Sequence, residues 1–498
     1  MRIAATYKVR LGKGVDKPFA DTVALYRMAV AFFVDMTIAR WDSDFEQCGN
    51  GKDAVRKAES LSLSTLKNPN PVLDFSSEFQ KFPCYLRRAA IAEAFGMVSS
   101  YMSNLKNWKE SDKDGRGKAP SRPEVGNSCP AMYKGNCYTR TGAYTARVKA
   151  WIRNTWDWVD VTLRKTDADY IARRCSSWKE CSPTLRKRGK NWSLDFSFEK
   201  SVTLNTTPVE ERRVVAVDLG INSAATCCVM EHDGTVTARR FLSMRREYDC
   251  LYRALDRIKA AQRSGARRMP KLWAMANNIN RGIAEKTAVF IQNLCALYNA
   301  DVVVMESLDL KGKKKGSKKQ RLHHWRAKYV QELVERKCHA DGNRFATVCA
   351  WNTSRLAFDG SGFVKRGSES GLTAGSYSVC EFRTGKVYNC DLNASYNIGA
   401  RYFIREILGS MPERARCEAE AKVPALRKRS TCTLSDLKGL RAVMEGLCLP
   451  SAERVMSGKT RDSRAPQGQP QELRQRDARD FSRARLHNNI ITENNNGN

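Results

Sequence analysis

The chain has 498 residues, enough for about three to five domains or lobes. Hydrophobic residues make up 42% of it, and Lys and Arg outnumber Asp and Glu by 86 to 53, a formal net charge of +33. This excess predicts a polyanionic partner, because each Lys or Arg that meets a phosphate releases a condensed counterion; the alternative is a solvated basic surface. We find no signal-peptide pattern and no apolar run of about 20 residues, so we expect no membrane partner.

The first half of the sequence predicts a β unit interrupted by helices. Apolar residues alternate in residues 2–11 (RIAATYKVRL) and in 191–204 (NWSLDFSFEKSVTL), which is typical of strands with one buried face. Between them, residues 19–42 and about 77–109 have helical character.

The second half begins abruptly at Val214. Residues 214–242 predict three strands with a turn at Asp233-Gly234, and a basic helical tract follows to about residue 298. The elements expected next are an apolar strand in 300–310, an amphipathic helix in 323–342, a strand in 346–354 and a helix that opens at Asp391. The apolar pattern ends near residue 451, which predicts a disordered tail.

Three carboxylates stand where these elements begin or end: Asp218, Glu306 and Asp391. Brought together, they would repel one another and raise one another's pKa, and Mg²⁺ relieves such repulsion with hard oxygen ligands. Two ions about 3.5–4 Å apart can drive phosphodiester cleavage. Singly, each acid could be a turn or cap residue, and Asp391 could cap its helix.

Two other classes fit part of this pattern. ATPases of the actin and Hsp70 type, and sugar kinases, have a similar DLG strand whose acid coordinates Mg²⁺ near ATP. They also need a second glycine-rich phosphate turn, which we do not find, and the net charge argues against them. A non-catalytic RNA-binding protein is the other alternative.

The segments VVAVDLGIN, VVVMESLDL and YNCDLNASYNIGARY resemble the three RuvC motifs of TnpB transposon-encoded nucleases, which are similar to the small type V CRISPR effectors. LVERKCHADGNRFATVCAWNTS resembles the segment of helix, glycine and strand that ends in Thr-Ser, here Thr353-Ser354. The resemblance is good over about residues 214–408, and the N-terminal half matches only in outline.

The resemblance implies an α+β multidomain fold. A β-barrel-like wedge domain would carry a helical recognition insertion. A ribonuclease H-like (RuvC) α/β nuclease domain would follow, with an inserted target nucleic-acid-binding segment similar to a degenerate zinc ribbon. The implied bounds are 1–20 and 125–212 for the wedge, 21–124 for the recognition insertion, 213–345 and 385–450 for the nuclease, 346–384 for its insertion, and 451–498 for the tail.

The implied function is an RNA-guided DNA endonuclease with a two-metal mechanism. Asp218, Glu306 and Asp391 map onto the catalytic acids of the family and would hold two Mg²⁺ ions. The partners would be a guide RNA, transposon-derived or from a CRISPR array, and double-stranded target DNA that is read by base pairing. A non-cleaving RNA-guided DNA-binding protein is the alternative, and monomer and dimer are both open.

The sequence departs from the family at the zinc ribbon. Ala357 and Gly360 stand where the first two cysteines would be, and Cys349, Cys380 and Cys390 are the candidate Zn²⁺ ligands that are left. Tetrahedral zinc needs four N or S ligands, commonly in paired knuckles. We therefore expect a metal-free remnant with these cysteines in its core. We expect residues 359–376 (DGSGFVKRGSESGLTAGS) to form a mobile loop that helps to admit the target strand.

Basic and aromatic residues provide candidate contacts to nucleic acid. Those in the helical insertion are Arg87, Arg88, Tyr101, Asn104 and Lys106, and those in a cationic loop are Lys313, Lys314 and Lys315. The alternative is that Tyr101 packs and Asn104 faces water. The 17 cysteines form no framework and are typical of reduced thiols, which predicts a cytoplasmic protein. The resemblance implies that this cytoplasm is bacterial or archaeal.

Overall fold

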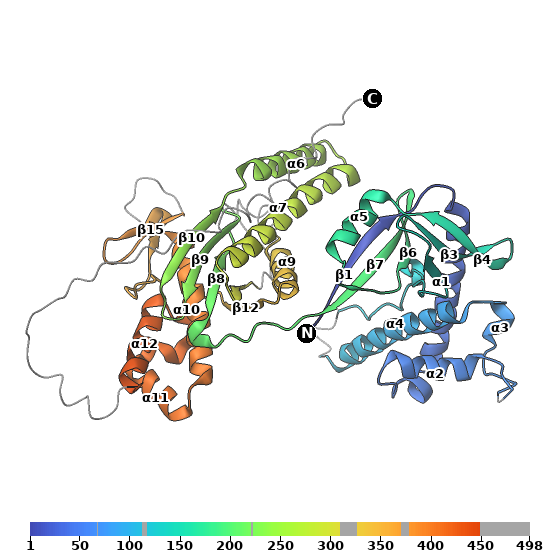
Figure 1. The fold of residues 1–498 in the computed structure, drawn as a ribbon, viewed down its shortest axis with the longest axis horizontal. Coiled ribbons are helices and arrows are strands. Elements are labelled where there is room, and N and C mark those ends of the chain that lie inside the picture. The colour runs from blue at the N-terminus through green and yellow to red at the C-terminus, as the bar shows by residue number, and fades with distance from the viewer. Residues whose placement is uncertain (67, 112–116, 221–222, 309–325, 370–377, 449–498) are drawn as a thin grey trace, which may run out of the picture. The chain divides into compact units, whose positions relative to one another are not determined.

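A computed structural model of the chain describes residues 1–448 apart from 67, 112–116, 221–222, 309–325 and 370–377 (Figure 1). The chain divides into two compact units, Met1–Leu440 and Arg441–Asn498, and almost all described elements belong to the first. The predicted tail, 451–498, and the predicted contacts Lys313, Lys314 and Lys315 lie outside the described residues. The architecture is α+β and multidomain, as expected.

The N-terminal lobe contains two small antiparallel sheets. Strand β1 pairs with β7 along its whole length, from Arg2 opposite Ser201 to Arg10 opposite Ser193. The two strands predicted from alternating residues are therefore neighbours, although the chain between them is long. The strands of the first sheet are β1 (Arg2–Arg10), β5 (Lys179–Glu180), β6 (Thr184–Arg188) and β7 (Asn191–Ser201), and those of the second are β2 (Tyr138–Arg140), β3 (Thr145–Ile152) and β4 (Thr155–Thr162).

Helices fill the chain between β1 and the second sheet, as predicted. They are α1 (Asp16–Ala39), α2 (Gly51–Ser62), α3 (Phe75–Glu78) and α4 (Cys84–Glu110), and α5 (Lys165–Arg174) follows β4. Among the described residues, α1 is long and apolar enough to cross a membrane by length and composition. The expectation of no such apolar run was therefore wrong. Phe19, Tyr26 and Phe33 of α1 are fully buried in the lobe, as in a core helix, so this is weak evidence for a span.

The second lobe is built on a five-stranded sheet in the order β10-β9-β8-β11-β12. Strands β8, β11 and β12 are parallel; β9 runs antiparallel to β8, and β10 runs antiparallel to β9. Their bounds are β8 (Arg213–Asp218), β9 (Ala225–Glu231), β10 (Val236–Leu242), β11 (Val302–Ser307) and β12 (Arg344–Cys349). The predicted turn at Asp233-Gly234 joins β9 to β10, with Gly234 at φ +87°.

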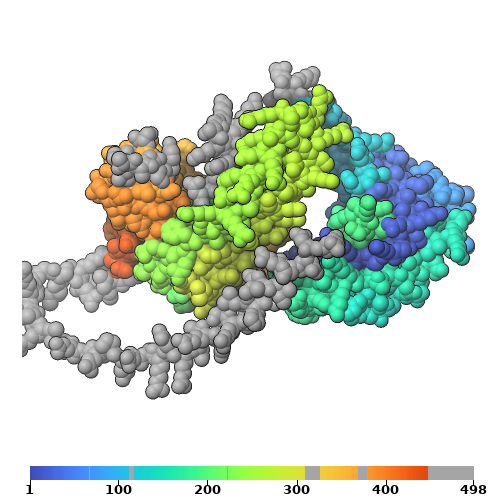
Figure 2. Space-filling model, turned by 90° about the horizontal axis from the view of Figure 1, so that it is seen from above, coloured from blue at the N-terminus to red at the C-terminus, as the bar shows by residue number. Residues whose placement is uncertain are grey.

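Helices cover both faces of this sheet, which is why its central strands are apolar on both sides (Figure 1). One face packs against α7 (Pro270–Leu297) and α9 (Ala327–Ala340), through residues such as Val215 and Val217. The other face packs against α10 (Cys390–Ser410), where Gly399 lies close to Ala216 and Met230. Helices α6 (Arg245–Arg263) and α7 are open to solvent along the yellow-green surface in Figure 2.

A three-stranded sheet is inserted between β12 and α10. Its strands are β13 (Lys365–Arg366), β14 (Val379–Glu381) and β15 (Val387–Asn389). The predicted insertion bounds, 346 and 384, do not match these elements: β12 belongs to the large sheet as far as Cys349, and β15 belongs to the insertion. Helices α11 (Glu413–Lys422) and α12 (Leu434–Cys448) follow α10, and Leu434 of α12 packs on the β9–β10 turn.

Candidate active site

Strand register brings Asp218 and Glu306 to one edge of the five-stranded sheet. In the parallel pair β8–β11, Val302 lies opposite Val214 and Met305 opposite Val217, so Glu306 is level with Asp218 on the next strand. Neighbouring strands are about 4.8 Å apart and side chains alternate between faces. Both carboxylates therefore point to the face of the sheet that α10 covers.

Asp391 lies in the first turn of α10, at the same edge. The helix is capped by Asn389, whose Oδ1 accepts a hydrogen bond of 2.9 Å from the amide of Leu392. The alternative that Asp391 caps this helix is thus wrong, and its carboxylate is not used in capping. Gly399 allows the close approach of α10 to the sheet, because a Cβ there would lie 2.9 Å from Sδ of Met230.

All three carboxylates are half-buried, and those of Glu306 and Asp391 act electrostatically on that of Asp218. Burial raises the pKa of Asp218 well above its usual value, and the charges of Glu306 and Asp391 raise it further. Burial also raises the pKa of Glu306, although a hydrogen bond from Thr353 Oγ1 lowers it in part. Burial likewise raises the pKa of Asp391, although the positive charge of Arg366 lowers it in part. The structure therefore places Glu306 and Asp391 within electrostatic reach of Asp218, at one edge of the sheet.

The oxygen atoms of the three acids are suitable ligands for a hard divalent cation, although the acids are not arranged as a complete metal-binding cluster in this structure. Among the described residues, no three His, Cys, Asp or Glu side chains lie close enough together to hold a metal ion. The three acids supply oxygen donors only, which is what Mg²⁺ prefers. Burial is the main cause of all three raised pKa values, and a bound cation would offset the cost of burying the charged carboxylates.

The inserted sheet supplies Arg366, a cation that was not among the predicted site residues. Its charge acts on both Asp218 and Asp391, and its guanidinium donates a bond of 3.3 Å to Ser354 Oγ. Arg366 falls within the loop predicted at 359–376. In the structure it instead pairs with Cys380 in a strand. No local signal marked this residue, because its position depends on the pairing of β13 with β14.

Asp218→Asn should stabilise the metal-free protein at neutral pH. Because the folded-state pKa of Asp218 lies above the unfolded-state value, its contribution to stability is present at acidic pH and is lost as the pH rises from the ordinary carboxyl range through the raised value. We expect the melting temperature at pH 7–8 to rise by roughly 3 °C or more, and the gain to disappear near pH 4. Thermal melts in EDTA across this pH range measure it, and a gain independent of pH contradicts it.

The cysteines considered for zinc do not gather in one place. Cys380 and Cys390 are buried and in contact with each other, packed among Phe358, Phe382 and Tyr388. Cys349 is exposed at the end of β12. An aromatic core thus occupies the described part of the insertion.

The predicted contacts in α4 divide into two groups. Arg87 and Arg88 both bind the Glu59 carboxylate, at 3.0 and 2.9 Å, so α2 already engages these guanidinium groups. Asn104 and Lys106 are exposed further along the helix, and Tyr101 is half-buried. The second group has the accessibility that a nucleic-acid contact needs.

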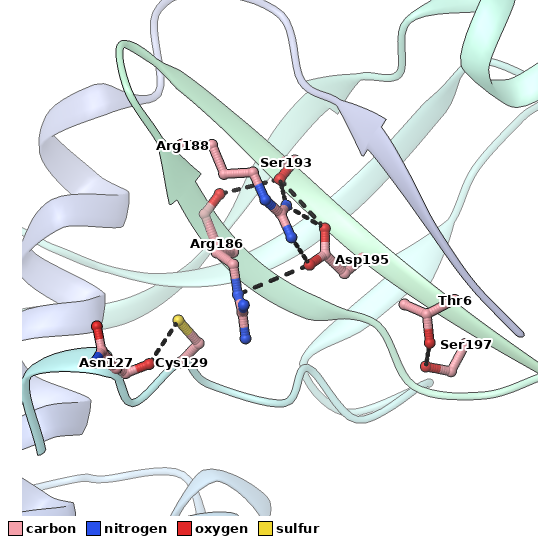
Figure 3. A network of polar contacts seen from close by, with 8 residues as sticks. All are labelled: Thr6, Asn127, Cys129, Arg186, Arg188, Ser193, Asp195 and Ser197. Carbon is pink, nitrogen blue, oxygen red and sulfur yellow. Dashed lines mark hydrogen bonds and ion pairs between the residues drawn. The ribbon is translucent and has the colours of Figure 1, made fainter. Parts of the chain in front are cut away.

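The cationic tract Arg186–Lys190 is also engaged within the protein (Figure 3). Arg188 donates two hydrogen bonds, of 2.6 and 2.5 Å, to the buried carboxylate of Asp195, and Arg186 lies 3.8 Å from it. The ammonium of Lys187 lies over the ring of Trp192. These contacts join β6 to β7 and leave the tract less available to RNA than its sequence suggests.

Comparison with known proteins assigns the N-terminal lobe. The Aq_aa04 family matches residues 5–152, from β1 to the end of β3. Protein aq_aa04 of Aquifex aeolicus (strain VF5) is 31% identical over 133 residues, covering 24% of this chain and 74% of the relative. The chain belongs to the Aq_aa04 family. In this Aq_aa04-family chain the matched residues include most of β1, helices α1 to α4 and strands β2 and β3.

A second relative concerns the resemblance to TnpB. The TnpB-like protein aq_aa05 of Aquifex aeolicus (strain VF5) is 26% identical over 239 residues, covering 43% of this chain and 76% of the relative. The predicted resemblance is confirmed: this Aq_aa04-family chain is TnpB-like. A solved Cas12f1–sgRNA–target DNA complex covers 80% of this chain and 98% of that chain at 15% identity and a TM-score of 0.30. The assignment rests on the sequence relatives.

Proposed function

We propose that the chain is an RNA-guided DNA endonuclease that hydrolyses target phosphodiesters at Asp218, Glu306 and Asp391. The observation that carries the proposal is the placement of two carboxylates level on adjacent parallel strands, with the third at the start of the helix that covers them. The strand order, with two antiparallel strands followed by three parallel ones, is that expected of a ribonuclease H-like (RuvC) domain.

The three carboxylates would hold two Mg²⁺ ions, which supply charge stabilisation to the attacking and leaving oxygens. The other residues act around them. Thr353 donates to Glu306 and restricts its carboxylate, and Arg366 places a positive charge beside Asp218 and Asp391, where a phosphate would enter.

The partners of the proposed enzyme are a guide RNA and double-stranded DNA. The net charge of +33 suits two polyanions, and the TnpB-like relative belongs to the class of protein that the sequence motifs resemble. The guide would be transposon-derived or from a CRISPR array, and the enzyme would act in the cytoplasm.

Purified protein with its copurified RNA provides the test. We expect one discrete RNA species, cleavage of a matched duplex in Mg²⁺ and no cleavage in EDTA. Binding of the matched duplex without cleavage under any divalent ion would favour the non-cleaving regulator. Hydrolysis of ATP without nucleic acid would favour the ATPase alternative.

Alanine at both Tyr101 and Asn104 should reduce cleavage or change the preferred target-adjacent motif, with RNA affinity unchanged. The two residues share one face of α4, where donors could reach base edges. Cleavage of a library of randomised flanking sequences measures the preference. An unchanged preference and rate would place motif recognition elsewhere, with the N-terminal strand as the next candidate.

A further inference from the structure

Helix α10 carries a line of polar side chains inside the core. Asn393, Asn397 and Arg401 are spaced four residues apart, so they share one face of the helix. They are 0%, 0% and 4% exposed. We call these three residues the polar ridge. Burying such groups is costly unless each finds partners, so the contacts of the ridge indicate its role.

The ridge binds the backbone from Cys349, the last residue of β12, onward. It also contacts the backbone of Cys432 and Leu434, further along the chain. Arg401 Nη1 donates to the carbonyl oxygens of Cys349 and Trp351, at 2.7 and 2.9 Å. Asn397 Nδ2 donates to the carbonyl oxygen of Thr353 at 2.9 Å.

Asn393 completes the same set of contacts. Its Nδ2 donates to the carbonyl oxygen of Leu356 at 2.8 Å, and its Oδ1 accepts from the amide of Phe358 at 2.8 Å. The ridge therefore holds residues 349–358, the clamped turn, from Cys349 through Phe358.

The clamped turn lies between Glu306 and Asp391, two of the three candidate acids, and is linked to both. Thr353, 2% exposed, lies in the turn and donates its hydroxyl to Oε1 of Glu306. Asp391 precedes Asn393 by two residues on α10. The path from Asp391 through the ridge and the turn to Glu306 thus consists of buried hydrogen bonds and one helix. In addition, Arg401 lies close enough to Glu306 for the two charges to interact.

We propose that the polar ridge positions the candidate metal site, by fixing the clamped turn so that Thr353 holds Glu306 in place relative to Asp391. The inference rests on the proposed function, since it takes these acids as Mg²⁺ ligands. Asn393 and Asn397 are positioning residues, because they act through the turn that carries Thr353. Arg401 is a positioning residue that acts through the same turn and also through its charge on Glu306. Partners that orient a metal-binding carboxylate commonly change metal affinity about 10- to 100-fold when removed.

Four variants separate positioning from simple stability. Thr353→Val removes the hydroxyl and leaves the ridge intact, and Thr353→Ser keeps a hydroxyl. Arg401→Gln removes the guanidinium of the ridge that binds the carbonyl oxygens of Cys349 and Trp351. The matched control is Arg405→Gln, because Arg405 is four residues further along α10 and donates to the carbonyl oxygen of Thr347 within β12, away from the turn.

The measurements are Mn²⁺ binding to the full-length protein without nucleic acid, by electron paramagnetic resonance of the free ion, and the Mg²⁺ needed for half-maximal cleavage. The Mn²⁺ binding that Asp218→Asn abolishes is taken as binding at the candidate metal site. We expect Thr353→Val and Arg401→Gln to weaken Mn²⁺ binding about 10-fold or more. Thr353→Ser and Arg405→Gln should bind like the parent.

Unchanged or tighter Mn²⁺ binding by Thr353→Val overturns the inference, even if Arg401→Gln fails to fold. A parent protein that binds no Mn²⁺ at this site overturns it as well. If the parent shows the expected pattern of binding but cuts no DNA with its RNA, the proposed function fails and the positioning role stands.

Discussion

Asp218→Asn is expected to lower the rate of target-DNA cleavage by roughly 10³-fold or more while the affinity for guide RNA and for matched DNA is kept. The amide has nearly the same shape as the carboxylate, so the sheet should keep its packing. It loses the negative charge that would hold the ions, at the position where the pKa is raised by burial and by both other acids. Single-turnover cleavage with saturating RNA measures the effect.

Asp233→Asn is the matched control for this change. Asp233 lies in the β9–β10 turn of the same sheet and accepts hydrogen bonds from the amide and the hydroxyl of Thr235. Asn can still accept from the amide through Oδ1, and its Nδ2 can donate to the hydroxyl oxygen in place of the second bond. It should cleave at close to the parent rate. Loss of activity in both variants, or in neither, would show that Asp218 has no special place in the chemistry.

Arg366→Ala should give the second largest loss, about 10²-fold in the cleavage rate. This guanidinium is the cation from the insertion that acts on both Asp218 and Asp391, and its Nε is buried without a partner among the described side chains. Arg366→Lys should recover part of the rate, because it restores the charge without the planar fork.

Arg383→Ala serves as its control, since Arg383 is exposed in the turn that joins β14 to β15 of the same small sheet. The rates of the three variants are compared under single turnover, together with DNA affinity. If only DNA affinity falls, or if the Arg366 and Arg383 variants lose equal activity, Arg366 is a non-specific contact with the DNA backbone and not part of the cleavage site.

The sequence was most informative where local pattern and burial coincide. The apolar runs before Asp218 and Glu306 favoured buried strands, and the periodic segment after Asp391 favoured a buried helix. The structure has these elements as β8, β11 and α10. Their convergence could be expected because parallel strands share a carboxyl edge.

The missed elements depend on contacts between distant residues or on unusual turns. The β3–β4 hairpin turns at Arg153 and Asn154, both at positive φ, and Arg is not a residue that marks such a turn. Arg366 reaches the acids only through the pairing of two short strands. The polar ridge is visible in the sequence as polar side chains spaced four residues apart in an apolar helix. The partners of these side chains could not be inferred from the sequence.

The charge pattern predicts the general kind of partner, a polyanion, but it does not predict which individual residues are free to contact that partner. Glu59 engages Arg87 and Arg88 from another helix, and Asp195 engages Arg188 from the next strand. A basic run in the sequence does not reveal a carboxylate that tertiary structure places against it, so it predicts net attraction to a polyanion better than it predicts a contact.

The most direct test of the central claim is the anomalous scattering of Mn²⁺ in crystals of the protein with its RNA and target DNA. The account predicts two peaks about 3.5–4 Å apart that lie against the carboxylates of Asp218, Glu306 and Asp391. Peaks that contact none or only one of these carboxylates, in a complex that cleaves its DNA, would contradict it.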